Sequence, residues 1–376
     1  MKRGVLLLWT VAAVPASAWA QEPGYPITVV PPGKGAYQFP QGYQTPWDKI
    51  QMLVTEKLAP NLYSVHGSAG LDPAHPDAAG GRVAVLFGSD GVLMVDTEDL
   101  QLAAKTLDVI RTFTSAPIKI VVNSHIHSDH TGGNAFFAKQ GAVIFSQENL
   151  RDEMQSPPGQ GNGARAPDPA SVPTAVYRYG SPGTPAVTIH MNGETVDFIP
   201  MMPSHTAGDT IVRFNKANVI YIEDFYRNFG YPFADQANGG SIKGMIEAVD
   251  LIQKLADADT TLAPGHGTLV RKKDLLGYRA MLVDILGKVQ KLREEGKLLD
   301  EVLAANLTAP YDGTTQGDNE AEQGPVHHRG VRRSERLPAC CKRRTENAEA
   351  HRAGEVGPPV QNIAPDSCLN PPAPSR

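Results

Sequence analysis

The sequence predicts an α/β fold, in which strands and helices are interleaved along the chain. β-rich segments outnumber helical segments in each half, and the two kinds alternate. A dense group of polar side chains, residues 125–130, begins two residues after a β-rich run, at a strand end where α/β folds place their chemistry. The 376 residues are 41% hydrophobic and 20% charged, so the chain can bury the core of one large domain.

The first half of this domain is expected to begin with strands. Leu62 to His66 is the first, and Ser89-Asp90-Gly91 forms the turn of a hairpin that follows. A long Gly/Pro-rich loop, Gly67 to Arg82, separates the two. The remaining elements expected in this half are the hairpin strands Val83–Phe87 and Val92–Val95, a helix over Leu100–Phe113, a strand over Ile118–Val122, a helix over Asn134–Lys139, a strand over Ala142–Phe145 and a helix over Gln147–Met154.

A second Gly/Pro-rich loop, Gln155 to Pro173, precedes the second half and is long enough to border a site. Hydrophobic periodicity then predicts more strands than helices. The expected strands are Val187–Met191, Glu194–Ile199, Thr210–Phe214, Val219–Ile222 and Thr261–Ala263, and the expected helices are Ser241–Ala256 and Asp274–Leu292.

The ends of the chain differ from its body. Residues 1–20 combine basic residues, a short apolar run and a small-residue end at Ala20, which is the pattern of a secretory signal peptide. We therefore expect a periplasmic or secreted protein that is cleaved near Ala20. Residues 21–57 are expected as an irregular arm, 58–309 as the catalytic domain and 310–376 as a disordered tail, whose abrupt onset also fits a shifted reading frame.

Charge and cysteine content limit the partners and the means of stabilisation. A net charge of −5 and an isoelectric point of about 6.1 give no long-range attraction to nucleic acid or anionic lipid. We expect a small-molecule substrate, no nucleic-acid partner and no stable membrane insertion, and we leave the oligomeric state open. Cys340, Cys341 and Cys368 all lie in the tail, so the body has no disulfide framework.

Residues 125–130, His-Ile-His-Ser-Asp-His, concentrate side chains that bind metals. Zinc takes neutral imidazole and carboxylate ligands, and a catalytic zinc site keeps a position open for water. In a loop that leaves a strand, His125 and His127 can point to one metal while Asp129 and His130 turn toward a second. The alternative of hydrogen-bonded loop residues is disfavoured, because so many polar groups at the end of an apolar strand are hard to satisfy without a metal.

Three more candidate ligands follow, each after a β-rich segment. His205 lies in Pro-Ser-His-Thr-Ala-Gly-Asp, Asp224 follows the apolar run that ends at Ile222, and His266 lies in Pro-Gly-His-Gly. A shared metal site requires ligands at strand ends that meet. Taken singly, each of the three could equally be an ordinary loop residue.

The whole series resembles the metallo-β-lactamase superfamily. The resemblance covers roughly residues 58–292 and rests on HxHxDH, followed by a histidine, an aspartate and the histidine of Pro-Gly-His-Gly. It implies a four-layer αββα sandwich with the site along one edge of two packed sheets. It also implies a ligand set: His125, His127 and His205 for a first zinc, Asp129, His130 and His266 for a second, with Asp224 bridging the two.

The same resemblance implies two Zn²⁺ ions and a metal-bridging hydroxide that attacks a substrate carbonyl. Asp129 is the expected catalytic residue, because it can orient the water as well as bind metal. Asp96 matches an acidic position that supports the ligands in this superfamily, although a turn or cap aspartate explains it equally well from the residues alone.

The ligand set also separates the activities of the family. Asp224 stands where some β-lactamases have a cysteine, and it makes the set similar to that of glyoxalase II and lactonases, whereas export favours β-lactamases. We expect an exported zinc-dependent hydrolase of a carbonyl bond in a cyclic amide or ester, with β-lactams among the candidates. The alternatives are a glyoxalase II-like thioesterase or lactonase, an iron-dependent oxidoreductase on the same fold, and a non-catalytic metal-binding module.

Other polar and aromatic residues carry weaker signals. Three histidines outside the pattern, His66, His75 and His190, are expected to be ordinary strand or loop residues, and His327 and His328 fall in the tail. Tyr226, Asn228 and Tyr231 follow Asp224 closely enough to line a pocket, but they could equally serve packing.

Overall fold

The structure is a computed structural model that describes residues 48, 50–67, 79–155, 168–228 and 231–312. The predicted signal peptide at 1–20 lies outside the described residues, as do residues 21–47 of the expected arm and 313–376 of the expected tail. Among the helices of the described part, none is both long and apolar enough to cross a membrane.

The first sheet has seven strands in the order β1-β2-β3-β4-β5-β6-β7. Neighbouring strands are antiparallel from β1 to β4 and parallel from β4 to β7. The strands are β1 (Met52–Ala59), β2 (Leu62–Gly67), β3 (Ala79–Gly88), β4 (Gly91–Val95), β5 (Ile118–Val122), β6 (Val143–Gln147) and β7 (Ala175–Tyr177). The helices in this half are α1 (Ala103–Arg111), α2 (Ser128–Thr131), α3 (Asn134–Ala138) and α4 (Glu148–Met154), and a short 3₁₀ turn spans Pro169–Ser171.

The second sheet has five strands in the order β12-β11-β10-β9-β8, with only the β11–β12 pair parallel. Its first hairpin follows from the sequence, because Asn192 and Gly193 both have positive φ and close a two-residue turn between Met191 and Glu194. The strands are β8 (Val187–Met191), β9 (Glu194–Pro200), β10 (Thr210–Phe214), β11 (Val219–Glu223) and β12 (Thr261–Pro264), and the helices are α5 (Ile242–Leu255), α6 (Leu275–Glu294) and α7 (Leu299–Ala304).

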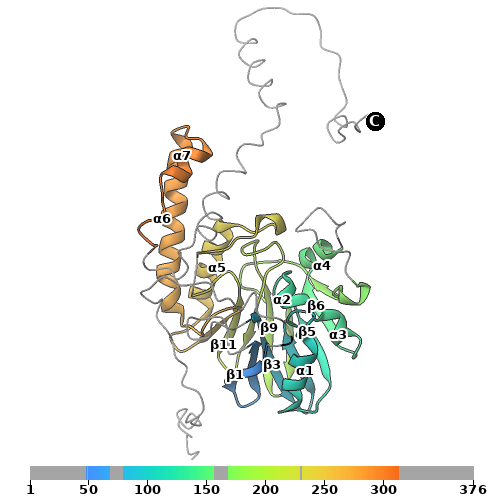
Figure 1. Cartoon of the computed structure of the whole chain (residues 1–376). Helices are drawn as coiled ribbons and strands as arrows, with labels where there is room; N and C mark the ends of the chain where they lie inside the picture. Colours follow the sequence, from blue (N-terminus) through green and yellow to red (C-terminus); the bar gives the residue numbers. More distant parts are fainter. Residues whose placement is uncertain (1–47, 49, 68–78, 156–167, 229–230, 313–376) are drawn as a thin grey trace, which may run out of the picture. The chain divides into compact units, whose positions relative to one another are not determined.

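Three separate hydrophobic clusters show how the layers are stacked. One cluster joins α1 and α3 to one face of the first sheet, a second fills the space between the two sheets, and a third joins α5 and α6 to the outer face of the second sheet. Figure 1 shows the helices on either side of the strands in this order. Helix, sheet, sheet and helix form four layers, so the predicted αββα sandwich is confirmed.

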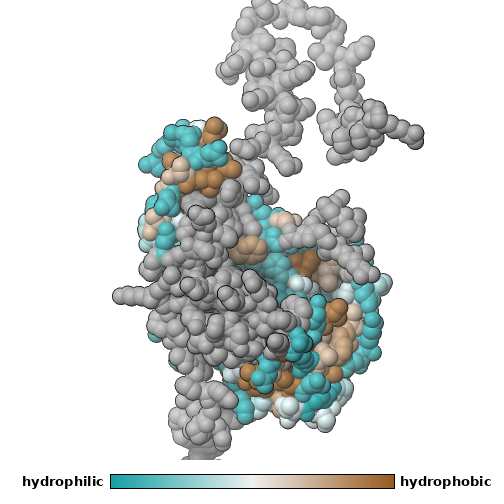
Figure 2. Space-filling model, viewed as in Figure 1, coloured by the Kyte–Doolittle hydropathy of each residue, from teal (hydrophilic) through white to brown (hydrophobic). Residues whose placement is uncertain are grey.

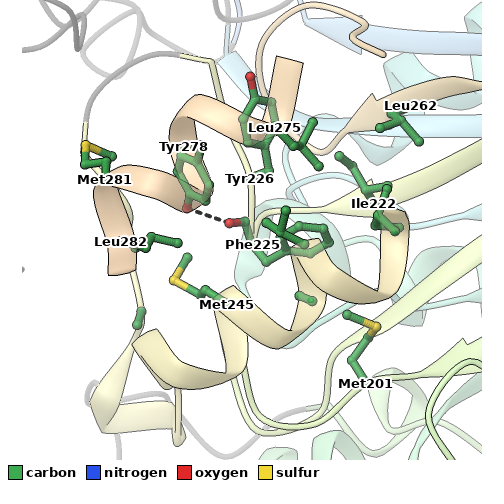
Figure 3. Packing of buried hydrophobic residues seen from close by; sticks show 14 of the residues in the cluster. Met201, Ile222, Phe225, Tyr226, Met245, Leu262, Leu275, Tyr278, Met281 and Leu282 are labelled. Atoms are coloured by element: carbon green, nitrogen blue, oxygen red, sulfur yellow. Dashed lines mark hydrogen bonds between the residues drawn. The ribbon is translucent and has the colours of Figure 1, made fainter. Parts of the chain in front are cut away.

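The outer cluster on the second sheet also fixes the chain next to the site. Ser241 caps α5 by accepting a hydrogen bond from the N–H of Gly244, and the helix buries Met245, Val249 and Ile252 on one face. The Tyr278 hydroxyl of α6 donates to the carbonyl of Phe225 at 2.6 Å, as Figure 3 shows. Helix α6 thereby holds the segment that directly follows β11.

The structure differs from the sequence-based expectation at three strands. β1 occupies Met52–Ala59, most of which was expected to belong to the irregular arm. Its middle residues Thr55, Glu56 and Lys57 are polar because β1 is an edge strand, paired only with β2. β3 begins at Ala79, inside the expected loop, and β7 has only three residues, too few for a periodic signal.

The described surface mixes polar and apolar side chains. On the face shown in Figure 2, hydrophobic patches are separated by hydrophilic residues. The most exposed large apolar side chains are Leu298 at 68% and Leu100 at 61%. Exposed apolar residues of this kind are ordinary on surfaces that face water.

Candidate metal centre

The seven predicted ligands lie on loops at the carboxyl ends of strands. The loop after β5 and the one-turn helix α2 carry residues 125–130, the β9–β10 loop carries His205, and Asp224 and His266 follow β11 and β12. The side chains form two groups, and within each group the ligand atoms lie within 4.8 Å of one another. The first group is His125, His127, His205 and Asp224, and the second group is Asp129, His130 and His266.

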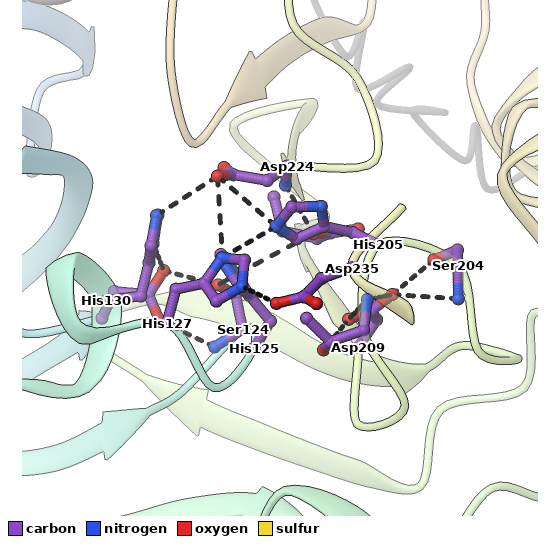
Figure 4. Close-up of polar contacts among 12 residues, drawn as sticks. Ser124, His125, His127, His130, Ser204, His205, Asp209, Asp224 and Asp235 are labelled. Atoms are coloured by element: carbon purple, nitrogen blue, oxygen red, sulfur yellow. Dashed lines mark hydrogen bonds and ion pairs between the residues drawn. The ribbon is translucent and has the colours of Figure 1, made fainter. Parts of the chain in front are cut away.

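In the first group, three imidazole nitrogens point at one another (Figure 4). His127 Nδ1 lies 3.2 Å from His125 Nε2 and 3.0 Å from His205 Nε2. The opposite nitrogen of each ring has a partner outside the group, which fixes the tautomer. His125 Nδ1 donates to Ser124 Oγ at 3.1 Å, His127 Nε2 to Asp235 at 2.9 Å, and His205 Nδ1 to the carbonyl of Phe233 at 2.6 Å.

These tautomers leave three lone pairs converging without a hydrogen between them. Ser124 Oγ donates its own hydrogen to Asp96, so it must accept from His125. Lone pairs facing one another at about 3 Å repel, and this separation leaves no room for a water between them. A cation satisfies all three at once, so the first group fits a divalent metal held by imidazole nitrogens.

The second group joins two histidines to a carboxylate. His266 Nε2 lies 2.9 Å from Asp129 Oδ2 and 3.4 Å from His130 Nε2. His130 Nδ1 donates to Asp96 Oδ2 at 2.8 Å, which leaves Nε2 free to face the group. The second group therefore offers two imidazole nitrogens and a carboxylate oxygen, a donor set that also suits zinc.

Asp224 lies between the two groups. Its Oδ2 is 3.2 Å from His266 Nε2 and 3.6 Å from His130 Nε2, and it is 3.8 Å from the Nε2 atoms of both His125 and His205. Glu223, at a φ of 47°, turns the chain at the end of β11 and so aims Asp224 inward. Gly265 is required beside it, because a Cβ there would lie 2.0 Å from Asp224 Oδ1.

The electrostatics of the histidines differ between the groups. Burial, with the neighbouring His127, lowers the pKa of His205 to about 3, and burial with His130 lowers the pKa of His125 well below its ordinary value. Burial acts in the same direction on His266, but Asp224 and Asp129 outweigh it and raise its pKa to about 9. The pKa of His130 is also raised, because neighbouring carboxylates, chiefly Asp224, outweigh the effect of burial.

The positive charges of protonated His130 and His266 in turn shift the pKa values of the neighbouring carboxyl groups. Burial alone would raise the pKa of both Asp129 and Asp224, but His130 and His266 outweigh it and hold both carboxyls well below their usual range. Both carboxyls are therefore ionised at neutral pH and are ready to act as ligands. In the protein alone, imidazolium protons balance their charge, and a metal would take the place of those protons.

Asp96 has the supporting position that the resemblance implied. Besides His130, it accepts hydrogen bonds from the N–H and the hydroxyl of Ser124 at 2.7 and 2.6 Å, and the Tyr221 hydroxyl lies 2.8 Å away. Its buried carboxylate thus holds His130 directly and His125 through Ser124. The residue is a support of the site rather than a turn or cap aspartate.

Sequence reasoning missed the segment that holds His127 and His205. Asp235 binds His127, its N–H donates to the carbonyl of His205 at 2.8 Å, and the carbonyl of Phe233 binds the His205 ring. Asp235 also caps the 3₁₀ turn Gln236–Asn238. An aspartate before such a turn reads as a cap, so nothing local marks it as a partner of a histidine.

The residues given lesser weight fall outside both groups. His66 is buried on β2 with its ring centroid 6.3 Å from that of His266, His190 is exposed on β8, and His75, His327 and His328 lie outside the described residues. Tyr226 and Tyr231 are packed in the core beside α6, and Asn228 hydrogen-bonds Thr268. Tyr226, Tyr231 and Asn228 therefore serve packing and loop structure. That the seven residues bind metal stays a prediction, although the structure brings all of them together.

Comparisons with known proteins agree with this architecture. Residues 78–266, half of the chain, match the family model described as the metallo-beta-lactamase superfamily. The metallo-beta-lactamase from Pontibacter korlensis is similar at 16% identity and a TM-score of 0.50, over 63% of this chain and 100% of that chain. The stereoselective inverting sec-alkylsulfatase Pisa1 from Pseudomonas sp. is similar at 17% identity and a TM-score of 0.55, over 77% of this chain and 51% of the sulfatase. The chain thus spans about half the sulfatase's length, and identities this low show a shared fold.

Proposed function

Because the chain belongs to the metallo-β-lactamase superfamily, we propose that it is a hydrolase that holds two zinc ions and cleaves a carbonyl bond in a small cyclic amide or ester. His125, His127 and His205 would hold one ion, Asp129, His130 and His266 the other, and Asp224 would be shared. Bound zinc would supply Lewis acidity and would lower the pKa of water at the site.

The position of Asp224 carries this proposal. One carboxylate oxygen lies within 3.8 Å of a nitrogen on four histidines, two from each group. A site for a single metal would not need a carboxylate between two sets of donors. A carboxylate shared in this way is the expected ligand of a two-metal site, which suits hydrolysis.

The protein's own residues keep these donors in the correct state and orientation. Ser124, Asp235, the Phe233 carbonyl and Asp96 each accept a hydrogen from one imidazole, so the other nitrogen of each ring faces the centre. The pKa of His130 is raised, so its centre-facing nitrogen would release a proton when a metal binds. Asp129 keeps 21% of its side chain exposed, more than Asp224 at 10%. It is therefore placed to accept a hydrogen bond from an incoming water and to orient it.

We also propose that the protein is exported, on the pattern of residues 1–20. Mass determination of the mature N-terminus in fractionated cells tests this point separately from the chemistry. A chain that begins at Gln21 in the periplasm or medium supports export. A full-length chain in the cytoplasm contradicts it.

Metal quantification, followed by a substrate panel on the same sample, tests the proposed chemistry. We expect two zinc ions per chain, and turnover of a cyclic amide or ester that is lost on chelation and restored by zinc. The panel holds a β-lactam, a lactone, a thioester and a secondary alkyl sulfate, so turnover of only the last two would refute the substrate class. Iron with oxygen uptake would indicate an oxidoreductase, and bound metal without any turnover would indicate a binding module.

A further inference from the structure

Arg82 of β3 is a buried arginine directed at the turn that carries His266. Its side chain is 1% exposed. Nε donates to the carbonyl of Pro264 at 2.8 Å, and Nη2 donates to the carbonyl of Gly267 at 2.6 Å. These two carbonyls flank His266 on either side along the chain.

The main chain of Arg82 extends the same contact. Its N–H donates to the carbonyl of Gly265 at 2.8 Å, so one residue binds three of the four carbonyls in Pro-Gly-His-Gly. Its own carbonyl lies 2.7 Å from the hydroxyl of Tyr221, which also lies 2.8 Å from Asp96. The Tyr221 hydroxyl, which has one hydrogen to donate, thus lies between the main chain of Arg82 and the carboxylate that holds His130.

Partners on the neighbouring strands compensate the buried charge. Nη1 donates to Ser64 Oγ at 2.7 Å and pairs with the carboxylate of Glu56. A guanidinium can serve all these acceptors because it presents five donors in one rigid plane. A lysine ammonium could not reach the Pro264 and Gly267 carbonyls together while keeping Glu56.

His266 also lacks the kind of support that other histidines of the centre have. Its Nδ1 is buried and has no hydrogen-bond partner among the described residues, whereas His127, His130 and His205 each use the outward nitrogen. Partners of that kind normally orient a metal-binding histidine. For His266, the contacts that fix its position are those of its main chain.

We propose that Arg82 is the positioning residue for His266, holding the Pro-Gly-His-Gly turn so that Nε2 faces Asp129 and Asp224. The inference rests on the proposed two-metal site. Its consequence is selective: loss of Arg82 weakens binding at the second group and spares the first, whose histidines it does not touch.

The test compares wild type with Arg82→Lys and Ser64→Ala, using Arg279→Lys as the matched control. Arg279 of α6 pairs with Asp250 of α5, so Arg279→Lys measures the effect on metal affinity of the same substitution at an ion pair away from the metal centre. Cobalt titration followed by absorption spectroscopy gives the two dissociation constants of each protein. We expect Arg82→Lys to weaken the second site by about 10- to 100-fold, with the first site within about 3-fold of wild type. Ser64→Ala should give a smaller effect of the same kind, and Arg279→Lys should leave both sites unchanged.

Several outcomes would overturn the proposal. Equal weakening of both sites would show a general structural role, and unchanged affinities in a folded Arg82→Lys protein would show no role at all. If Arg82→Lys does not fold, Ser64→Ala decides: selective weakening of the second site supports the proposal, and unchanged affinity overturns it.

A second readout separates this inference from the proposed function. If the wild-type protein binds fewer than two metal ions, the proposed two-metal function is refuted. Amide hydrogen exchange then tests the positioning role of Arg82 independently of metal binding. Faster exchange over residues 264–267 in Arg82→Lys, with wild-type exchange in Arg279→Lys, supports positioning. Equal exchange in all three proteins overturns it.

Discussion

The two ligand groups lie side by side, yet the protein holds them by different means. In the first group each imidazole is oriented through its outward nitrogen, by Ser124, Asp235 and the Phe233 carbonyl. In the second group only His130 is held in this way, and the turn around His266 is held by Arg82. The first group therefore depends on individual side-chain contacts, and the second depends more on the packing of β3 against the end of β12.

The groups also differ in their protons. The pKa values of His125 and His205 are lowered, so these rings are neutral at pH 7, whereas those of His130 and His266 are raised by the carboxylates beside them. His125 and His205 can accept a cation without losing a proton, but His130 and His266 must release protons first. Variants of single residues can test this comparison.

The largest effect is expected for Asp129→Ala. The change removes a ligand of the second group and the carboxylate that can orient water, so turnover should fall at least about 100-fold while the fold is kept. Steady-state kinetics with circular dichroism on the same sample measure this. Near-normal activity would refute the assignment of the second group.

Asp96→Asn should weaken the second group by about 10- to 100-fold in metal affinity, because the carboxylate charge is lost and one of the two oxygens that accept from Ser124 and His130 becomes an NH2 donor. The metal affinity of the first group should change less, because Asp96 contacts His125 only indirectly, through the hydroxyl of Ser124. Isothermal titration with zinc gives both constants. A larger loss at the first group would reverse the comparison.

Asp235→Asn is the corresponding substitution for the first group, because Asp235 binds His127 as Asp96 binds His130. It should weaken the first group by about 10-fold and leave the second near wild type, because among the ligands only His127 then faces a neutral amide in place of a carboxylate. The effect is smaller than for Asp96 because the His127 side chain is 21% exposed and water can replace the carboxylate. Zinc titration under the same conditions tests it, and equal loss at both sites would contradict it.

The smallest effect concerns Glu153 of α4, on the side of the first group. Burial, then the nearby Asp235 and Asp209, raise the pKa of Glu153 to about 7, and His127 opposes them. Because the pKa is higher in the folded chain than in the unfolded one, stability present below about pH 4.5 is lost as the pH rises through about 7. Glu153→Gln removes that loss.

Urea denaturation of wild type and Glu153→Gln at pH 5 and pH 8 measures this difference. Relative to wild type, the variant should gain about 1 to 2 kcal/mol in free energy of unfolding between the two pH values, after allowance for solvent screening. A difference that does not change with pH would show that Glu153 has an ordinary pKa.

The sequence predicted most of the fold because each sheet strand that carries a ligand is a strongly apolar run. β5, β11 and β12 were expected within one or two residues of their observed ends, and the order of the ligands identified the family. Edge strand β1 was missed, since its polar residues do not alternate with apolar ones. Local patterns therefore located the apolar strands that precede ligands better than they located edge strand β1.

The supporting residues were harder to predict because their partners are distant in sequence. Asp235 and His127 are 108 positions apart, and Arg82 was expected to end a loop rather than to reach the turn at His266. A sequence motif identifies the residues that bind a metal. The residues that orient those ligands come from distant parts of the chain and are found only once the tertiary structure is known. Asp96 was found because its place at the end of a strand matched a family position.

The contact between Arg82 and Pro264 spans 182 positions of the chain, and this has a consequence for folding. Contacts between segments so far apart form late, because the loss of chain entropy precedes the gain from the contact. Each ligand group takes two residues from the segment after β5, which includes α2, and the rest from loops that follow strands of the second sheet. A folding intermediate in which only one sheet has formed would thus have an incomplete set of metal ligands. Tight metal binding would therefore indicate that the two halves of the chain have packed together.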